Sequence, residues 1–61
     1  MPGFTGLSLL DTVRQSAAIH PHWDAKEHMA YLIDEAGFSE VEVVAANSDI
    51  VHTVLEIRSA R

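Results

Sequence analysis

Cysteine is absent from this chain of 61 residues, so no disulfide can stabilise it and no thiolate can act as a nucleophile or metal ligand. Long apolar runs are also missing, and every apolar run in the sequence is far too short to cross a bilayer. The first ten residues, MPGFTGLSLL, lack the positively charged start of a secretory signal. These absences predict a cytoplasmic protein that does not enter a membrane.

Basic residues are scarce. The chain has four Lys and Arg against nine Asp and Glu, which gives a net charge of −5. Eight of the acids fall within residues 24–61, where Lys26, Arg58 and Arg61 are the only bases. Nucleic acids and anionic membranes require clustered Lys and Arg. The charge balance therefore excludes both classes of partner.

Glycine occurs only three times, at isolated positions, so the chain has no G-x-G turn of the kind that approaches a nucleotide. None of its serines lies in a nucleophile motif. Catalysis by the isolated chain is accordingly not expected. A chain of this length buries only about 60% of its unfolded surface, so we expect it to depend on self-association or on a larger protein.

Two helices are predicted in the first half. The first covers residues 7–19, with Ser8 and Asp11 as a capping pair, and ends where Pro21 disfavours a helix at His20. The second covers residues 25–36, with Asp24 as N-cap and Glu27 three residues later. Its apolar stripe consists of Met29, Leu32, Ile33 and Ala36. Gly37 and Phe38 then form a Schellman-type stop, and residues 1–6 are predicted to be a loop.

Two strands are predicted in the second half. Residues 41–46, VEVVAA, alternate in polarity, and so do residues 50–58, where Val51, Thr53, Leu55 and Ile57 share one face. Asn47-Ser48-Asp49 between them is turn chemistry, which predicts an antiparallel hairpin. We expect Val41, Val43, Leu55 and Ile57 to lie under the second helix. The predicted fold class is therefore α/β, in the order helix, helix, strand, strand.

A two-stranded hairpin is not stable alone in water, and its edges must be covered. This is the physical reason to expect that the chain completes a larger sheet. The prediction is a single partial domain over residues 1–61, with a loop and weak helix in 1–23 and a helix plus hairpin in 24–61.

The phrase LIDEAGF, followed by VEVV and HTVLEIR, resembles the C-terminal end of a class I, Rossmann-like S-adenosylmethionine-dependent methyltransferase. The resemblance covers roughly residues 22–58. It implies a C-terminal fragment that shapes the sheet edge and the substrate side of such an enzyme, with the rest of the methyltransferase domain as its partner. S-adenosylmethionine is implied for a full-length relative, but no residue here matches its binding motif, so the chain alone carries no cofactor site. The alternative is a small non-enzymatic ααββ module that acts by dimerisation or partner binding.

In an open α/β sheet, ligands bind beyond the carboxyl ends of the parallel strands. If residues 41–46 form such a strand, Asn47 and the segment His20, His22 and Trp23 face the substrate, where a neutral histidine could accept a proton. Three other interpretations are considered: a solvated loop with Trp23 packed on the helix, a metal site, and a likeness to the H-x-W segment of some O-methyltransferases, against which Gly37-Phe38 argues. The metal ligands would be His20, His22, Asp24 and His28.

Overall fold

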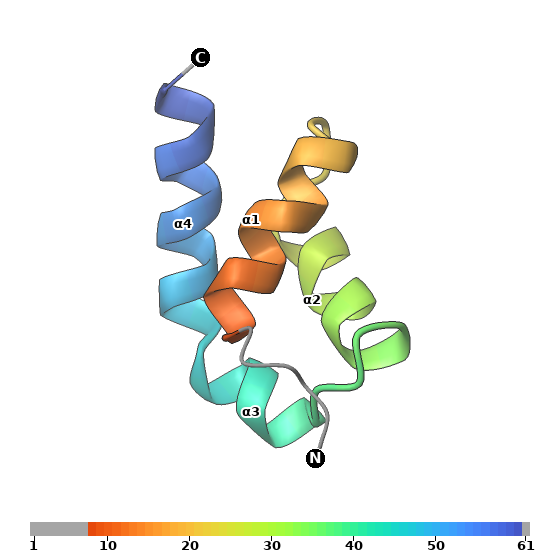
Figure 1. Ribbon diagram of the computed structural model, residues 1–61. Helices are drawn as coiled ribbons and strands as arrows, with labels where there is room; N and C mark the ends of the chain where they lie inside the picture. The colour runs from red at the N-terminus through yellow and green to blue at the C-terminus, as the bar shows by residue number, and fades with distance from the viewer. Residues whose placement is uncertain (1–7, 61) are drawn as a thin grey trace.

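The computed structural model describes residues 8–60, which form four α-helices and no strand. The helices are α1 (Leu9–Ile19), α2 (Ala25–Asp34), α3 (Glu40–Ala45) and α4 (Asn47–Ser59). In Figure 1, α4 stands along one side of the molecule, α1 crosses beside it, α2 lies on the far side of α1, and the short α3 closes the base. The molecule measures 35 × 20 × 16 Å along its principal axes.

The first two helices confirm the sequence-based prediction to within two residues at each end. Ser8 caps α1, accepting a hydrogen bond from the Asp11 N–H at 3.1 Å, while the Ser8 N–H donates to the Asp11 carboxylate. Asp24 and Glu27 form the same reciprocal box at the start of α2, at 3.0 and 2.9 Å. Each box satisfies two backbone donors that a helix start otherwise leaves unpaired.

The stop after α2 is also confirmed. Gly37 has φ +88°, and the Phe38 N–H donates to the Leu32 carbonyl oxygen at 2.9 Å, as in a Schellman motif. Phe38 is partly buried against the core. The predicted loop at residues 1–6 and the first residue of the predicted helix, Leu7, lie outside the described residues.

The predicted first strand is wrong, because residues 40–45 are α3. Ser39 is the N-cap of this helix: its side chain accepts from the Glu42 N–H at 3.1 Å, and its own N–H donates to Glu42 Oε1 at 3.0 Å. The Ser39 N–H and the Ser39 hydroxyl, which also donates to Glu42 Oε1 at 3.0 Å, hold the pKa of the Glu42 carboxyl below its usual value. A capping box at Ser39 thus starts a helix where sequence alternation favoured a strand. Val43 is buried, whereas Val41 is 78% exposed.

The predicted second strand is wrong for a related reason. Ile50, Thr53 and Val54 are buried, and Ile57 is half-buried, so the inward positions follow the i, i+3, i+4, i+7 spacing of a helix. Asn47-Ser48-Asp49, expected as the hairpin turn, is instead the first turn of α4. Ala46 alone joins α3 to α4.

These helices overturn the α/β fold class, the antiparallel hairpin and the role of residues 40–58 in completing a methyltransferase sheet. Residues 8–60 contain no sheet edge that another strand would have to cover, because the helices pair their backbone groups internally. The apolar stripe of α2 therefore packs on helices rather than on a hairpin.

The core is small, and all four helices contribute to it. Its buried centre consists of Val13 from α1, Leu32 from α2, Val43 from α3, and Ile50 and Val54 from α4. Leu9, Leu10, Ala25, Met29, Ala36, Phe38 and Ala46 surround this centre. In residues 8–60 no helix is long and apolar enough to cross a membrane.

Candidate functional site

An aromatic cluster gathers where the chain passes from α1 to α2. The Trp23 indole stacks on the His20 ring with 3.9 Å between centroids and 6° between planes. It meets His28 edge-on at 5.3 Å and Tyr31 at a tilt of 52° and 5.7 Å. The main-chain N–H of Trp23 also donates to the His20 carbonyl oxygen at 3.2 Å, and Arg58 of α4 donates to the main-chain carbonyl oxygen of Trp23 at 2.9 Å. Trp23 is therefore held by three neighbouring rings and two hydrogen bonds.

Ser16 and His28 form a buried polar pair behind Trp23. Ser16 Oγ lies 2.8 Å from His28 Nδ1 and donates its proton to the Val13 carbonyl oxygen at 3.0 Å. A hydroxyl has one proton, so the Nδ1–H of His28 is the donor in the first bond. Burial lowers the pKa of His28 and outweighs the opposing effect of the Glu27 and Asp24 carboxylates, while the nearby His20 and Arg58 act in the same direction as burial.

The Ser16–His28 pair has the elements of a nucleophile and a base, but its position fits a structural role. Ser16 is 4% exposed and His28 is 1% exposed. A substrate carbonyl could not approach the hydroxyl oxygen without opening the α1–α2 interface. We therefore assign the pair to the core, where each polar atom satisfies the other.

The outer face of α2 carries a shallow hollow of about 290 Å³ that is open to solvent. Its lining consists of Trp23, Glu27, Ala30, Tyr31, Asp34 and Glu35, and we call it the α2 hollow. Residues 27, 30, 31 and 34 follow helical spacing, so they form one continuous stripe on α2. Trp23, placed just before the N-cap, closes one end of that stripe. The result is a concave surface that combines two aromatic rings with three carboxylates.

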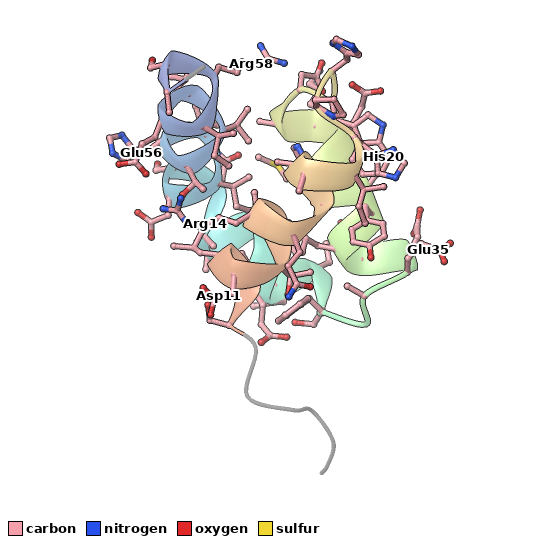
Figure 2. The ribbon with its side chains drawn as sticks, turned by 45° about the horizontal axis from the view of Figure 1, so that its top comes forward. Asp11, Arg14, His20, Glu35, Glu56 and Arg58 are labelled. Atoms are coloured by element: carbon pink, nitrogen blue, oxygen red, sulfur yellow. The ribbon has the colours of Figure 1, made fainter. Side chains whose placement is uncertain are left out.

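Two of the three acids of the α2 hollow, Asp34 and Glu35, lie at unfavourable places on the helix. Asp34 is the last residue of α2 and Glu35 is its C-cap, and the last turn contains no basic residue. The C-terminal end of a helix carries partial negative charge, so acids there are destabilising by about 0.3–1 kcal/mol each. Figure 2 shows Glu35 on the same side of the molecule as His20, well away from the Arg14–Glu56 ion pair at the α1–α4 contact. A cation in the hollow would offset this local excess of negative charge.

The candidate residues expected from sequence are only partly brought together. His20 and Trp23 are in ring contact, and His22 is exposed in the turn between them. Asn47 is the first residue of α4 and Arg58 is the residue before its last, so the two lie at opposite ends of this helix, which Figure 1 shows in full. Arg58 follows Asn47 by eleven residues in the helix, a rise of roughly 16 Å. Asn47 therefore does not belong to the site that contains Trp23.

The ligands of the alternative metal site do not converge either: no three His, Asp or Glu side chains within residues 8–60 are grouped so that they could hold a metal ion. The α2 hollow itself was not predicted. In the sequence, Tyr31, Asp34 and Glu35 have the pattern of an ordinary solvated face of the helix, and Glu27 is explained by its capping role alone. The available signal was the regular spacing of four residues from Trp23 to Glu27 and from Glu27 to Tyr31, since Glu27 and Tyr31 share one face of the helix and Trp23 comes just before its N-cap.

Comparison of the chain with protein-family models, with curated proteins and with solved structures gives no match. The function therefore has to be inferred from the site itself.

Proposed function

We propose that this chain is a small helical binding module that holds a positively charged group in the α2 hollow, and that it acts by binding rather than by catalysis. One observation carries the proposal: the hollow joins the Trp23 and Tyr31 rings to the carboxylates of Glu27, Asp34 and Glu35. Aromatic faces and carboxylates both attract cations, and together they favour a cation over a neutral or anionic ligand.

The rest of the described chain supports binding in preference to catalysis. The serine that lies beside a histidine is buried, and the exposed histidines His20, His22 and His52 have no nucleophile beside them among the interactions described. The net charge of −5 would also draw cations towards the molecule. The absence of cysteine supports a cytoplasmic location as part of this proposal.

The methyltransferase resemblance stays a prediction that no comparison tests. Its sequence phrase LIDEAGF spans the end of α2 and the Gly37 stop, a combination that also ends helices in unrelated folds. Association with a methyltransferase body or with a second copy remains compatible with a binding module. Such association could not use a strand from residues 40–59, because these residues form helices.

The test is a fluorescence titration, since Trp23 is the only tryptophan in the chain and lines the hollow. Lysine amide, arginine amide and tetramethylammonium are each added, with sodium chloride at matched ionic strength as the reference. We expect saturable changes in Trp23 emission with at least one organic cation and none with sodium chloride. If none of the three organic cations binds, the proposal is wrong.

A pair of charge variants locates the binding. Asp34→Asn with Glu35→Gln removes two carboxylates from the hollow while keeping their shapes. Glu40→Gln with Asp49→Asn removes the same charge from the first turns of α3 and α4. The hollow variant should weaken cation binding by about fivefold or more, whereas the control should change it by less than about twofold. Equal weakening in both would indicate a general effect of net charge.

A further inference from the structure

We infer that the charged group recognised by the α2 hollow is a quaternary ammonium, such as the trimethylammonium of choline or of a trimethylated lysine side chain. This inference rests on the proposed function and specifies its ligand. It depends on how apolar and charged groups are divided in the hollow, and on how open the hollow is.

The apolar part of the hollow favours methyl groups over N–H donors. Trp23, Ala30 and Tyr31 provide a surface of rings and one methyl group, which cannot replace the water molecules of an unmethylated ammonium. A lysine ammonium has three donors and is strongly hydrated, whereas a quaternary ammonium has none and loses its water more easily. A ring face attracts the charge of either one when the cation lies within about 6 Å of the ring centre.

The ring pair is also fixed in advance. The Trp23 and Tyr31 centroids are 5.7 Å apart, so a cation of methylated size at their border is within reach of both. The indole of Trp23 is restrained by its stacking on His20 at 3.9 Å, and the hydrogen bond from Arg58 to the Trp23 carbonyl oxygen restrains the backbone that carries it. A preformed surface avoids the cost of ordering side chains when the ligand binds.

The carboxylates supply negative charge from either side of the rings, so they do not occupy the position of the ligand at the rings. Glu27 Oε1 already accepts a hydrogen bond from the Asp24 N–H at 2.9 Å, so this side chain is held along the start of α2. Asp34 and Glu35 lie at the other end, beyond Tyr31. A cation at the rings is therefore flanked by negative charge on both sides. The acids at the C-terminal end of α2 gain a partner that the described chain does not give them.

The openness of the hollow indicates how the ligand is presented. It is a shallow depression on the outer face of α2, so it contacts one side of an ammonium group and not a whole molecule. Shallow sites of this kind bind an isolated small cation weakly. The same ammonium carried on a peptide or on choline offers identical chemistry at the rings, and the experiment separates these two sources.

The experiment compares four probes by isothermal titration and by Trp23 fluorescence with the full chain. Tetramethylammonium is the minimal ligand, choline and a trimethyllysine peptide are the two sources, and 3,3-dimethylbutanol is the neutral isostere of choline. The unmethylated form of the peptide is the matched control. We expect the three quaternary probes to bind, and the trimethylated peptide to bind about three- to tenfold more tightly than the unmethylated one.

The variants assign this preference to the rings. Tyr31→Leu keeps an apolar side chain but removes the ring face, and Tyr31→Phe keeps the ring. We expect Tyr31→Leu to reduce tetramethylammonium affinity by about three- to tenfold and Tyr31→Phe to change it by less than about twofold. Far-UV circular dichroism establishes that both variants keep the helical fold, and Tyr31→Trp provides a second ring-bearing variant if Tyr31→Phe does not fold.

The outcomes separate the inference from the proposed function. Equal binding of methylated and unmethylated peptides overturns the quaternary ammonium but leaves a cation-binding module. Equal binding of choline and 3,3-dimethylbutanol shows a simple apolar surface and overturns both. Binding of the trimethylated peptide without choline supports a protein partner, and binding of both supports a site that reads the ammonium alone.

Discussion

The guanidinium of Arg58, near the end of α4, donates a hydrogen bond to the main-chain carbonyl oxygen of Trp23, 35 residues earlier, at 2.9 Å. This contact links the last helix to the segment just before α2, and Arg58 is labelled in Figure 2. It also restrains the backbone that presents the indole to the α2 hollow. The C-terminal end of α4 therefore meets the connection between α1 and α2 at the candidate site.

Replacing Arg58 tests this link. Arg58→Ala should lower the free energy of unfolding by about 0.5–1 kcal/mol, because a charge-assisted but exposed hydrogen bond is lost. It should also alter Trp23 emission in the absence of any ligand. Urea unfolding followed by circular dichroism measures the first effect. Lys26→Ala removes a cation from the first turn of α2, where it opposes the helix dipole, and should cost nothing. Similar losses in both variants would argue against a specific role for Arg58.

The hydroxyl of Ser16 should contribute more to the stability of the fold than its small size suggests. Ser16→Ala leaves the Nδ1–H of His28 without its acceptor in the core, and we expect a loss of about 1–3 kcal/mol. Ser48→Ala is the matched control, since it makes the same exchange at an exposed helical position and shares the gain in helix propensity. Denaturant midpoints for both variants measure the difference. A Ser16→Ala protein as stable as Ser48→Ala would show that the pair contributes nothing.

Stability should also depend on pH through His28. Burial places the pKa of His28 in the folded protein below its ordinary value of 6.5. Between these two pKa values the unfolded chain binds more protons, so stability rises with pH in that interval. The contribution is fully present above about pH 6.5 and is lost as the pH falls towards the folded-state pKa.

A variant isolates this effect from the exposed histidines. His28→Asn removes the buried titrating group but leaves His20, His22 and His52 in place. Unfolding midpoints are measured for both proteins between about pH 8 and pH 5. We expect the wild-type protein to lose more stability than the variant over the acidic half of this range. If the stability of the two proteins falls in parallel with pH, the pH dependence does not come from His28.

Gly37 provides a test of the helix stop. A Cβ at this position would meet no atom within 4 Å, so a substitution creates no clash. Its φ of +88° nevertheless strains any residue with a side chain. Gly37→Ala should therefore cost about 1–2 kcal/mol, and Gly37→Asn should cost less because asparagine tolerates this region better. Thermal unfolding of the two variants gives the comparison, and equal stability of Gly37→Ala and wild type would contradict the left-handed cap.

The first half of the fold could be predicted because its signals are local and agree with one another. Asp24 with Glu27 marks a helix start, Gly37 marks its end, and the apolar spacing between them fits only a helix. The second half could not be predicted in this way. Val and Ile at residues 41–57 favour strands by propensity, and their apolar positions fit a period of 2 as well as one of 3.6.

Packing decides between those two periods, and packing is not visible in a single sequence. Val54 contacts the α1–α2 core only if residues 47–59 form a helix. The Ser39–Glu42 capping box was the one local signal for the correct structure. At the site, the nearness of His20 to Trp23 followed from sequence. The Arg58 contact did not, because it depends on how α4 returns to α2.

Two adjacent residues of α4 provide the sharpest test of the fold. In the helix, Val54 is 6% exposed and Leu55 is 57% exposed. In the strand expected from alternation, the order would reverse, with Leu55 on the apolar face and Val54 on the other. Val54→Ala should therefore cost about 1–3 kcal/mol through lost burial and a cavity, although valine is the smaller side chain. Leu55→Ala should stay within about 0.5 kcal/mol, since it changes an exposed position.

The measurement is urea unfolding of both variants beside the wild-type protein, with far-UV circular dichroism to record helix content. A larger loss of stability for Val54→Ala than for Leu55→Ala establishes the helical period in this segment. Both variants remove apolar carbon atoms, and Leu55→Ala removes more of them, so only the deeper burial of Val54 explains that order. The reverse order, with a spectrum dominated by strand, would restore the hairpin. It would also separate Arg58 from Trp23, because a strand of residues 50–58 would not follow the path of α4. The α2 hollow and its cation would then lose the support that α4 gives to Trp23.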